Sequence, residues 1–303
     1  MDFDLSVRIG KIELKTPVII ASGVWPYEEE FWREERLHGV GAVCTKAISL
    51  NNRAGNSGTR LWETPAGMLN SIGLQNIGVG SFIEKYHSML INCGCPVIAN
   101  VVMESEAETA ETLMRLRDSG CISAVELNIS CPNVDGDGMA WGISEHGAAA
   151  AARLARKSWD GPLWVKMTPQ APYPAGVARA IESEGADALV VANTWLGMAM
   201  DITKAKPAFV RTVAGLSGPA VFPLALRLVW DVCGAVSIPV IGCGGVTTSA
   251  DCAAMMLAGA YAVEAGTAFF RNINAGRKIC DGLPVMLGQY GIAKISEITG
   301  MAR

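Results

Sequence analysis

Short apolar runs rich in Val, Ile and Ala alternate with segments of helical periodicity along the whole chain. This is the pattern of parallel strands that are buried on both faces. The strand-like runs are Pro17–Gly23, Gly41–Ser49, Pro96–Val102, Ala124–Ser130, Leu163–Pro169, Ala188–Thr194, Val240–Val246 and Ala262–Phe270. Helical segments between them include Ser105–Ser119, Ser144–Lys157, Pro174–Glu184, Pro223–Val232 and Ser249–Ala258. Eight such units predict an α/β fold, a (β/α)₈ or TIM barrel.

The length is compatible with one domain. Barrels of this kind run to about 250 residues or more as a single unit, so we expect residues 1–303 to form one barrel domain. Half of the residues are hydrophobic and only 18% are charged, which indicates a large buried core. A small hairpin, Leu5–Ile9 with Ile12–Leu14 around Gly10-Lys11, is expected to close the bottom of the barrel.

Charge and hydropathy argue against two classes of partner. The net charge is −4 and no basic run accompanies it, so nucleic-acid binding is not expected. No stretch approaches the roughly 18 uninterrupted apolar residues of a membrane span. The N-terminal Met1-Asp2-Phe3-Asp4 has no basic or apolar leader region. We therefore expect a cytoplasmic protein without membrane association.

The nine cysteines are better explained as reduced thiols than as a disulfide framework, because their number is odd and their spacing irregular. Cys93-Gly94-Cys95 could suggest a metal site, but neither a second Cys pair nor a His cluster with ligand spacing accompanies it. No metal is expected.

Polar residues and glycines collect at the ends of the predicted strands. In a barrel, all carboxyl ends of the strands lie on one face, where catalytic residues gather. The strand ends supply Ser22, Lys46, Asn100, Asn128, Lys166, Asn193, Gly244-Gly245 and Gly266-Thr267. A single buried Lys or Asn is often a satisfied core group, but two lysines and three asparagines converge here. Loops of roughly 30 residues follow strands two and six, far above the usual median of about 4–6, and are expected to form the substrate pocket and its lid.

Four motifs in order along the chain carry a resemblance to a known family. They are Thr45-Lys46-Ala47, the segment Glu63–Asn76 (ETPAGMLNSIGLQN), the segment Asn128–Val134 (NISCPNV) and Gly215-Leu216-Ser217-Gly218-Pro219. From about Pro17 to Phe270 the chain resembles class 1 dihydroorotate dehydrogenases, and most closely the class 1B catalytic subunit. The resemblance implies an FMN-dependent barrel that oxidises (S)-dihydroorotate to orotate in UMP biosynthesis.

The chemistry of that reaction explains the residue types. A base must take a proton from C5 while a hydride leaves C6 for the flavin, and Cys131 matches the family's base. A thiol has an ordinary pKa near 8.5, so the site must favour the thiolate or the rate must rise with pH. The alternative for Cys131 is a small buried hydrophobe, the usual fate of a free cysteine.

Orotate is a planar anion whose ring edge alternates donors and acceptors, which calls for side-chain amides. The amide positions that match the family are Asn70, Asn128, Asn133 and Asn193, with Thr194 beside them. Asn70 and Asn133 could instead only stabilise turns. Lys46, with backbone N–H groups in the segment Ser71, Ile72, Gly73 and Leu74, resembles the clamp on the substrate carboxylate.

Reduced flavin carries negative charge near N1, which a fixed cation stabilises. Lys166 fits that role, and the alternative, a buried ion pair, finds no carboxylate within its own strand Leu163–Met167. Lys46 resembles the residue that touches both flavin and substrate. The loops Gly242–Gly245 and Gly266-Thr267 supply a phosphate cradle. Further flavin contacts implied by the resemblance are Ser22, Ala47, Asn100, Asn128, Ala192 and Gly218.

Three departures from the family pattern leave the shape of the pocket open. The run Val101-Val102-Met103-Glu104 stands where small residues are more usual, and Trp195 stands where a smaller aliphatic is usual. Asp135-Gly136-Asp137 makes the catalytic loop acidic, either as a solvated turn or as an altered partner surface. Rival interpretations are an FMN barrel reductase acting on another pyrimidine, a flavin-free phosphate-binding barrel isomerase, and a barrel that has lost its chemistry.

The class 1B resemblance also implies partners. Electrons would leave FMN through a separate subunit that carries FAD and a [2Fe–2S] cluster, and would pass to NAD⁺. The chain has neither the Cys spacing for such a cluster nor a dinucleotide fingerprint, so those cofactors would lie on the partner. A homodimer flanked by two partner subunits, a heterotetramer, is the implied assembly.

Overall fold

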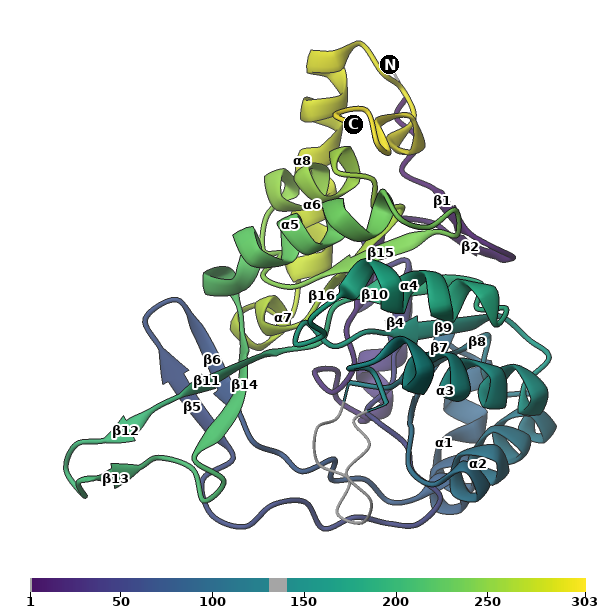
Figure 1. Cartoon of the computed structure of the whole chain (residues 1–303). Coiled ribbons are helices and arrows are strands. Elements are labelled where there is room, and N and C mark those ends of the chain that lie inside the picture. The colour runs from purple at the N-terminus through teal and green to yellow at the C-terminus, as the bar shows by residue number, and fades with distance from the viewer. Residues whose placement is uncertain (1, 131–140) are drawn as a thin grey trace.

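The computed structural model describes residues 2–130 and 141–303. Eight parallel strands close into a barrel in which each strand pairs with its neighbour in sequence order and the last pairs with the first. This confirms the predicted (β/α)₈ architecture (Figure 1). The barrel strands are β3 (Val18–Ile20), β4 (Ala42–Cys44), β7 (Val97–Val102), β8 (Ala124–Asn128), β9 (Leu163–Lys166), β10 (Ala188–Val191), β15 (Val240–Cys243) and β16 (Ala262–Ala265).

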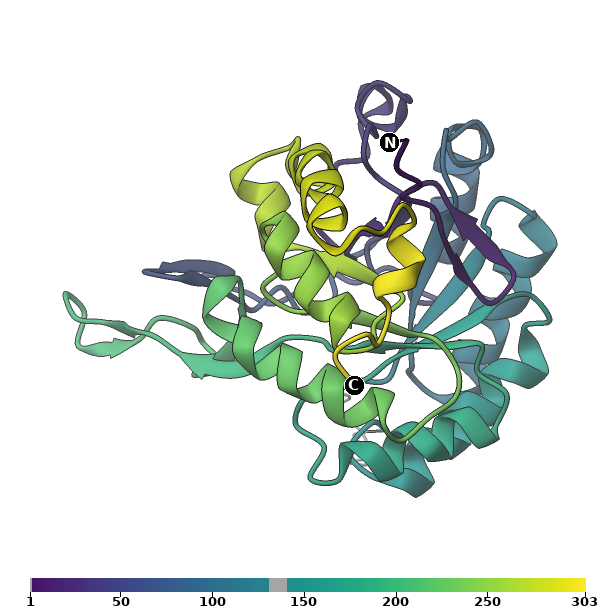
Figure 2. The same ribbon diagram turned by 90° about the horizontal axis from the view of Figure 1, so that it is seen from above.

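Helices surround the barrel. Neighbouring helices pack on one another around the outside and cover the outer face of the sheet (Figure 1, Figure 2). The inner face packs on itself across the closed barrel, so the apolar strands are buried on both faces. The first link, between β3 and β4, carries only a short 3₁₀ helix, η1 (Glu29–Trp32). The α-helices are α1 (Val79–Ile91), α2 (Glu106–Ser119), α3 (Glu145–Ser158), α4 (Pro174–Ser183), α5 (Phe222–Cys233), α6 (Ser249–Leu257), α7 (Thr267–Arg271) and α8 (Ala275–Tyr290). The 3₁₀ helices η2 (Pro219–Val221) and η3 (Ile295–Ile298) complete the set in the described ranges.

Local sequence fixes where several helices begin and end. The Ser105 side chain accepts a hydrogen bond from the Glu108 N–H at the start of α2, and Gly120 ends that helix in the left-handed conformation. At the start of α6, Thr248 and Asp251 cap each other's backbone N–H groups. These caps set the helix ends next to the strand ends, so the short loops between them hold fixed positions.

The N-terminal hairpin closes the bottom of the barrel, as predicted. Strands β1 (Val7–Ile9) and β2 (Ile12–Leu14) pair across a turn at Gly10, where φ is +58°. The Ile9 and Leu14 side chains are fully buried. A Cβ added to Gly41, just before β4, would lie 3.1 Å from the Leu14 Cβ, so the hairpin packs directly against the amino end of the barrel.

The two long loops join into a second sheet, which we call the arm. Strands β5 (Leu61–Thr64) and β6 (Gly67–Asn70) come from the loop after β4, whereas β11 (Trp195–Met198) and β14 (Val213–Ser217) come from the loop after β10. They form one antiparallel sheet in the order β11-β14-β6-β5. A short pair, β12 (Met200–Asp201) with β13 (Lys206–Pro207), extends it. The arm projects from the barrel in both views (Figure 1, Figure 2).

The predicted strand positions were right, but several predicted strands were too long. The run Ala262–Phe270 is strand only to Ala265 and then becomes α7 from Thr267. The run Ala188–Thr194 is strand only to Val191. The apolar composition continues past the last barrel hydrogen bond, so periodicity alone cannot place that end. In the described residues, no helix is long and apolar enough to cross a membrane.

Candidate active site at the barrel mouth

The predicted site residues that the structure describes gather at the carboxyl ends of the barrel strands, which we call the mouth. They lie in the second half of a strand or in the segment that follows it, and Thr267 begins helix α7. At these positions are Ser22, Lys46, Ala47, Asn100, Asn128, Lys166, Ala192, Asn193, Thr194, Gly244, Gly245, Gly266 and Thr267. Cys131, Asn133 and the acidic Asp135 and Asp137 lie outside the described residues.

A chain of amide and hydroxyl groups spans two neighbouring segments of the mouth. The Ser130 hydroxyl donates to the Asn128 Oδ1 at 2.5 Å, and the Asn193 Nδ2 donates to the Ser130 Oγ at 2.5 Å. Asn193 also offers its Oδ1 to the Thr194 N–H at 2.8 Å. Asn128 and Ser130 are buried, and Asn193 is half-buried. The three side chains hold one another in fixed orientations, and Ser130 was not among the predicted site residues.

The arm brings Asn70 to the same place. Asn70, at the end of β6, donates its Nδ2 to the Gly215 carbonyl on β14 at 3.1 Å. A Cβ on Gly215 would lie 2.3 Å from the Thr194 Oγ1 and 3.2 Å from the Asn70 Nδ2. Gly215 therefore allows the close approach of Asn70 and Thr194, which are far apart in sequence.

The segment after Asn70 is held in an unusual backbone conformation. Gly73 and Leu74 both have positive φ, +72° and +57°, and a Cβ on Gly73 would overlap Asn56. Asn56 supports the segment by donating its Nδ2 to the Ser71 Oγ at 3.0 Å and its backbone N–H to the Ile72 carbonyl at 2.9 Å. The positive φ of a leucine indicates that its surroundings hold it in place.

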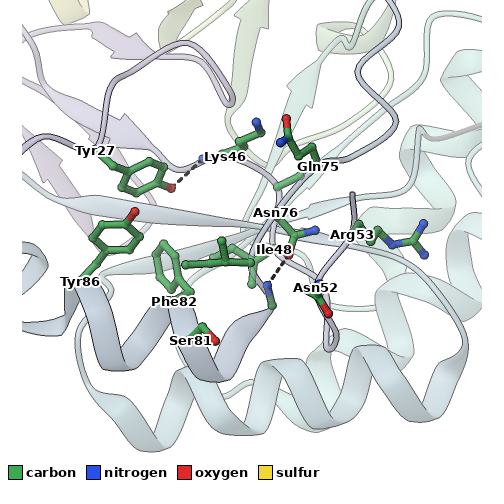
Figure 3. A pocket seen from close by; sticks show the side chains of 13 residues that line it. Tyr27, Lys46, Ile48, Asn52, Arg53, Gln75, Asn76, Ser81, Phe82 and Tyr86 are labelled. Carbon is green, nitrogen blue, oxygen red and sulfur yellow. Dashed lines mark hydrogen bonds between the residues drawn. The ribbon is translucent and has the colours of Figure 1, made fainter. Parts of the chain in front are cut away.

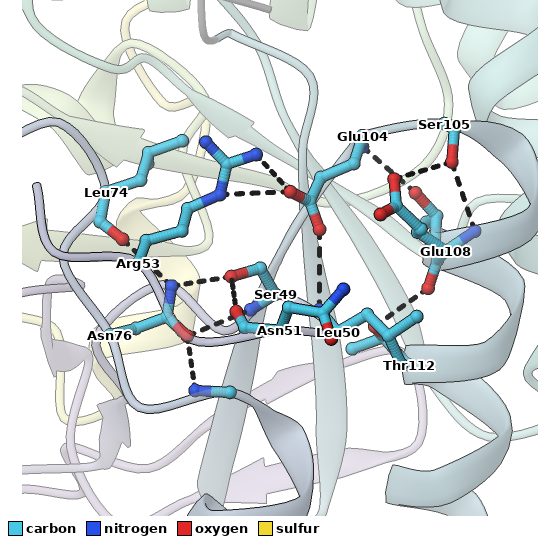
Figure 4. A network of polar contacts seen from close by, with 12 residues as sticks. Ser49, Leu50, Asn51, Arg53, Leu74, Asn76, Glu104, Ser105, Glu108 and Thr112 are labelled. Atoms are coloured by element: carbon cyan, nitrogen blue, oxygen red, sulfur yellow. Dashed lines mark hydrogen bonds and ion pairs between the residues drawn. The ribbon is translucent and has the colours of Figure 1, made fainter.

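A second support for this segment comes from the end of β7 (Figure 4). Asn76 and Arg53 exchange backbone hydrogen bonds, and the Asn76 Nδ2 donates to the Leu74 carbonyl at 2.9 Å. Arg53 forms a salt bridge with the buried Glu104, whose other oxygen accepts from the Leu50 N–H. Glu104, which stood out in the sequence as a departure from the family, thus anchors the loop that precedes the predicted carboxylate clamp.

Lys46 lies beside a cavity of about 560 Å³ between the loop after β4 and helix α1 (Figure 3). Its backbone N–H donates to the Tyr27 hydroxyl at 3.1 Å, and Tyr27 stacks on Tyr86 at 4.5 Å between ring centroids. Burial, and then the positive charge of Arg60, lower the pKa of the Lys46 ammonium. Lys46 and Arg60 are thus close enough for their charges to interact, and such a pair of cations is suited to an anionic ligand.

Lys166 is buried inside the barrel between two carboxylates. Its Nζ lies 2.7 Å from the Glu264 Oε2 on β16 and 3.4 Å from the Glu126 Oε1 on β8. Glu126 and Glu264 are 0% and 1% exposed. The sequence of β9, which contains Lys166, does not show these partners, because they lie on other strands. The ion pair that was the alternative for Lys166 is therefore present, and it does not exclude a contact with a ligand.

Two further polar side chains face this cluster. The Cys44 thiol donates to the Glu126 Oε1 at 3.3 Å, and the Asn100 Nδ2 donates to the same oxygen. The Asn100 Oδ1 is buried and has no hydrogen-bond partner among the described residues. An unpaired buried amide oxygen is unfavourable unless a ligand or water supplies a donor.

The glycine loops at the mouth pack closely together. Gly218, Gly244 and Gly245 have φ values of +98°, +140° and +76°. A Cβ on Gly245 would lie 2.8 Å from the Gly218 carbonyl oxygen, and one on Gly244 would lie 3.2 Å from the Trp195 ring. The Thr267 hydroxyl donates to the Ser217 Oγ at 2.7 Å. The loops after β10, β15 and β16 thus meet at one point of the mouth.

Sequence reasoning missed Glu126 and Glu264. Each is the one charged residue inside an apolar strand, in Ala-Val-Glu-Leu-Asn and Ala-Val-Glu-Ala-Gly. A carboxylate in the middle of such a run would be buried, and burial without a partner is unfavourable. A lone carboxylate in each apolar strand therefore could have indicated a buried polar cluster, although the sequence could not show that Lys166 is the shared partner. Within the described residues, Cys44, Glu126 and Glu264 are also the one group of three potential metal-ligating side chains, but the Lys166 ammonium at its centre disfavours a cation.

A closed parallel barrel with converging amides, lysines and glycine loops at the carboxyl ends of its strands defines an enzyme of the (β/α)₈ class. The family model described as dihydroorotate dehydrogenase matches residues 4–287. The chain belongs to the dihydroorotate dehydrogenase family.

Relatives support this membership over the full length. A protein of Trichlorobacter lovleyi named dihydroorotate dehydrogenase B (NAD(+)), catalytic subunit, is 44% identical over 296 residues, which cover 98% of this chain and 97% of the relative. A protein of the same name from Desulforamulus reducens is 43% identical and covers 100% and 99%. The crystal structure of DHODH from Eimeria tenella in complex with ferulenol shares the fold, with a TM-score of 0.83, 20% identity and coverage of 98% and 88%.

Proposed function

We propose that this chain is the catalytic subunit of an NAD⁺-linked dihydroorotate dehydrogenase, which oxidises (S)-dihydroorotate to orotate with FMN. The observation that carries the proposal is the hydrogen-bonded chain Asn128–Ser130–Asn193–Thr194 at a mouth that also holds Asn70 and Lys46. Side-chain amides both donate and accept, so they match the alternating edge of a pyrimidine ring. The names of the full-length relatives agree with this substrate.

The substrate's carboxylate would bind between Lys46 and the backbone N–H groups of Ile72, Gly73 and Leu74. The Ser71 N–H already donates to the Arg60 carbonyl at 2.8 Å, so Ser71 would contribute through its side chain. The positive φ angles of Gly73 and Leu74 are incompatible with a regular helix or strand, so the backbone here does not continue the hydrogen bonding of β6. Arg60 adds positive charge near Lys46 and holds the loop by donating to the Asn56 carbonyl at 2.7 Å. This arrangement binds and orients an anion without assistance from bulk water.

The residues at the mouth fit FMN. Asn100 offers a buried, unpartnered Oδ1, and Lys166 offers a buried cation. At Gly218, Gly244 and Gly245 a side chain would collide with its surroundings, so the backbone of these loops can approach a phosphate group closely. Gly266 and Thr267 would complete this cradle. Ser22, Ala47, Asn128 and Ala192 would complete the binding surface. When bound, FMN would accept the hydride from C6 of the substrate.

Cys131 would act as the base that removes the C5 proton. In sequence it directly follows Ser130, which is buried at the mouth. A thiol near its ordinary pKa of about 8.5 gives a reaction that accelerates as pH rises. The neighbouring Asn133 would contribute a fourth amide to the substrate.

A homodimer and a second, electron-transferring subunit with FAD and a [2Fe–2S] cluster complete the proposal. The arm supports the dimer, since it carries exposed apolar side chains away from the barrel, including Ile202 at 88% and Val210 at 74% exposure. An exposed apolar surface of this kind is typical of an interaction site.

The proposal is tested by purifying the chain, recording its visible spectrum and adding L-dihydroorotate without oxygen. We expect a yellow protein whose flavin band bleaches, and slow or absent bleaching for Cys131→Ala. Cys233→Ala, at the end of α5, is the matched control and should behave as wild type. A yellow protein that ignores dihydroorotate would move the substrate to another pyrimidine, and a colourless protein without affinity for FMN would overturn the proposal.

A further inference from the structure

The buried cluster around Lys166 contains two acids for one base. Lys166, Glu126 and Glu264 are 3%, 0% and 1% exposed, so water does not screen their charges. If both acids were ionised, the cluster would carry a net negative charge in the barrel core. Such an uncompensated charge is strongly unfavourable. One of the two acids is therefore expected to keep its proton.

The hydrogen bonds favour Glu264 as the protonated acid. The Glu126 Oε1 accepts from the Cys44 thiol, the Asn100 amide and the Lys166 ammonium, which together stabilise the ionised form of Glu126. The Glu264 Oε1 and the Glu126 Oε2 accept no hydrogen bond from any donor among the described residues. A proton on Glu264 supplies the missing donor, and a hydrogen bond between the two carboxyl groups raises the pKa of Glu264 and lowers that of Glu126. Burial, and then the charge of Glu126, raise the pKa of Glu264 to about 8.

The other groups that face the pair are neutral. Cys44 from β4 and Cys243 from β15 have thiol pKa values raised by burial, and Asn100 does not titrate. Burial alone would lower the pKa of Lys166, but the charges of Glu126 and Glu264 raise it well above its usual range. Proton exchange in this cluster near neutral pH is thus confined to the pair of glutamates.

We propose that Glu264 is a positioning residue whose proton adjusts the net charge around Lys166 to the redox state of FMN. This inference rests on the proposed function, because it requires flavin next to Lys166. With Glu264 protonated, the cluster is neutral overall and Lys166 can stabilise negative charge on reduced flavin. With Glu264 ionised, the cluster is negative and opposes reduction. By linkage, reduction of the flavin then increases the proton affinity of Glu264.

The midpoint potential of bound FMN tests the proposal. We expect the potential of the wild-type holoenzyme to fall more steeply with pH above about pH 8 than that of Glu264→Gln, which cannot ionise. The two potentials should agree well below that pH. In Glu126→Gln the remaining acid loses the negative neighbour that raises its pKa, so Glu264 should ionise beside Lys166 and the additional fall of the potential above about pH 8 should disappear. Glu106→Gln on α2, an exposed glutamate, is the matched control and should follow wild type.

A second measurement keeps the test decisive if Glu264→Gln folds poorly. The infrared difference spectrum between oxidised and reduced wild type should contain a buried carboxylic acid band, which Glu264→Asp should shift. Suppose that dihydroorotate still bleaches the flavin. The proposal is then overturned if the potentials of Glu264→Gln and wild type have the same pH dependence, or if the carboxylic acid band is missing. Failure of bleaching itself would count against the proposed function instead.

A different observation supports a second site, at the opposite end of the barrel. Cys93 and Cys95 line a pocket of about 440 Å³ formed by the end of α1 and the segments before β7 and β8. Their sulfur atoms lie 3.8 Å apart with only Gly94 between them in sequence. The hydrogen bond between the two sulfur atoms lowers the pKa of Cys93 to about 7. A half-buried thiol with such a pKa, next to a small pocket, is suited to reaction.

We infer that Cys93 and Cys95 form a reversible disulfide by exchange with a low-molecular-weight disulfide. The Cys93 thiolate attacks one sulfur of the small disulfide, forms a mixed disulfide and releases one small thiolate. The Cys95 sulfur then attacks the Cys93 sulfur, closes the Cys93–Cys95 bond and releases the second thiolate. The two protein protons pass to the two leaving thiolates. A disulfide across a single intervening residue is strained and is therefore easily reduced again.

The test uses the intact protein in oxidised and reduced glutathione at graded ratios, followed by thiol alkylation and mass spectrometry. We expect the peptide that contains both residues to lose two hydrogens reversibly in wild type. Cys95→Ser should stop at the mixed disulfide on Cys93. Cys121→Ser, in the same pocket, is the matched control and should leave the reaction unchanged. Complete alkylation of Cys93 and Cys95 at every ratio would disprove the site.

Discussion

At the scale of single residues, the mouth depends on groups that fix one another. Asn193 donates to Ser130 and accepts from the Thr194 backbone, so no part of its amide is free to rotate. A rigid amide discriminates against ligands that cannot pair with it, because the mismatch leaves a buried group without a partner. The specificity of the proposed site is therefore expected to reside in the orientation of its amides.

Replacing Asn193 by Ala should raise the KM for dihydroorotate by roughly tenfold to a hundredfold, since a hydrogen bond to a charged ligand is worth about 1.5–3 kcal/mol. Steady-state kinetics with a dye as electron acceptor measures this change. Asn92→Ala, at the exposed end of α1, is the control and should retain wild-type kinetics. An unchanged KM in Asn193→Ala would remove Asn193 from the substrate site.

The raised pKa of Glu264 predicts how stability depends on pH. The folded protein holds this proton more tightly than the unfolded chain, whose pKa is near 4.5. The stabilisation is complete below that value and is lost as pH rises to about 8. Urea denaturation should therefore show wild type losing stability relative to Glu264→Gln through this window. A constant difference between the two proteins would contradict the assignment of the proton.

At the scale of elements, sequence periodicity predicted the eight strands and the hairpin well, because burial on both faces produces uninterrupted apolar runs. It could not predict the arm. Strand β11 contains Gly197 and alternates half-buried with exposed residues, and its partner β14 lies beyond a further loop. The pairing of β14 with β6 depends on contacts between residues that are distant in sequence, which local patterns do not contain.

A substitution at Gly215 tests whether the packing of the arm positions Asn70 and Thr194 at the mouth. Gly215→Ala would place a Cβ 2.3 Å from the Thr194 Oγ1 and force Asn70 or Thr194 to move. We expect a loss of about a hundredfold in kcat/KM, as misplacement by about 1 Å typically causes. Gly80→Ala in α1, where a Cβ meets nothing closer than 3.8 Å, should be neutral. Wild-type kinetics in Gly215→Ala would show that this contact does not position the site.

The Arg53–Glu104 salt bridge should affect substrate binding through the loop it anchors. Glu104→Ala removes the support of Arg53, whose backbone pairs with Asn76 next to Leu74. We expect the KM for dihydroorotate to rise about tenfold with a smaller change in kcat, because a positioning contact and not a reacting group is lost. Glu104→Gln should recover part of the loss. Equal effects of both variants on kcat alone would contradict this role.

At the scale of the whole molecule, the strand ends predicted from sequence lie together at the mouth. Polar residues at those ends therefore indicated the position of the candidate site. Ser22, Lys46, Asn128 and Asn193 were predicted from position alone, and the barrel brings their segments to one mouth. The partners of Lys166 were missed because closure of the barrel joins β16 to β3 and places Glu264 opposite its ammonium. The contact between Lys166 and Glu264 therefore follows from barrel closure and not from the local sequence of either strand.

The exposed apolar arm predicts self-association. Ile202→Glu with Val210→Glu should shift sedimentation from dimer to monomer, since two buried charges oppose an apolar interface. Val285→Glu, an exposed valine on α8 away from the arm, is the matched control and should remain a dimer. A wild-type protein that sediments as a monomer at every concentration would refute the proposed assembly.

The pairing of Asn70 with Gly215, 145 positions apart, has a consequence for the order of folding. Strand β6, which ends at Asn70, is synthesised early, whereas its partner strand β14 follows only after β10. Closing so long a loop is slow unless other contacts first bring its ends together, and here the barrel strands do so. The nascent chain can therefore complete helices α1–α4 before the partner strand of Asn70 has been synthesised. Binding competence should appear as a late kinetic phase, after the bulk of secondary structure has formed.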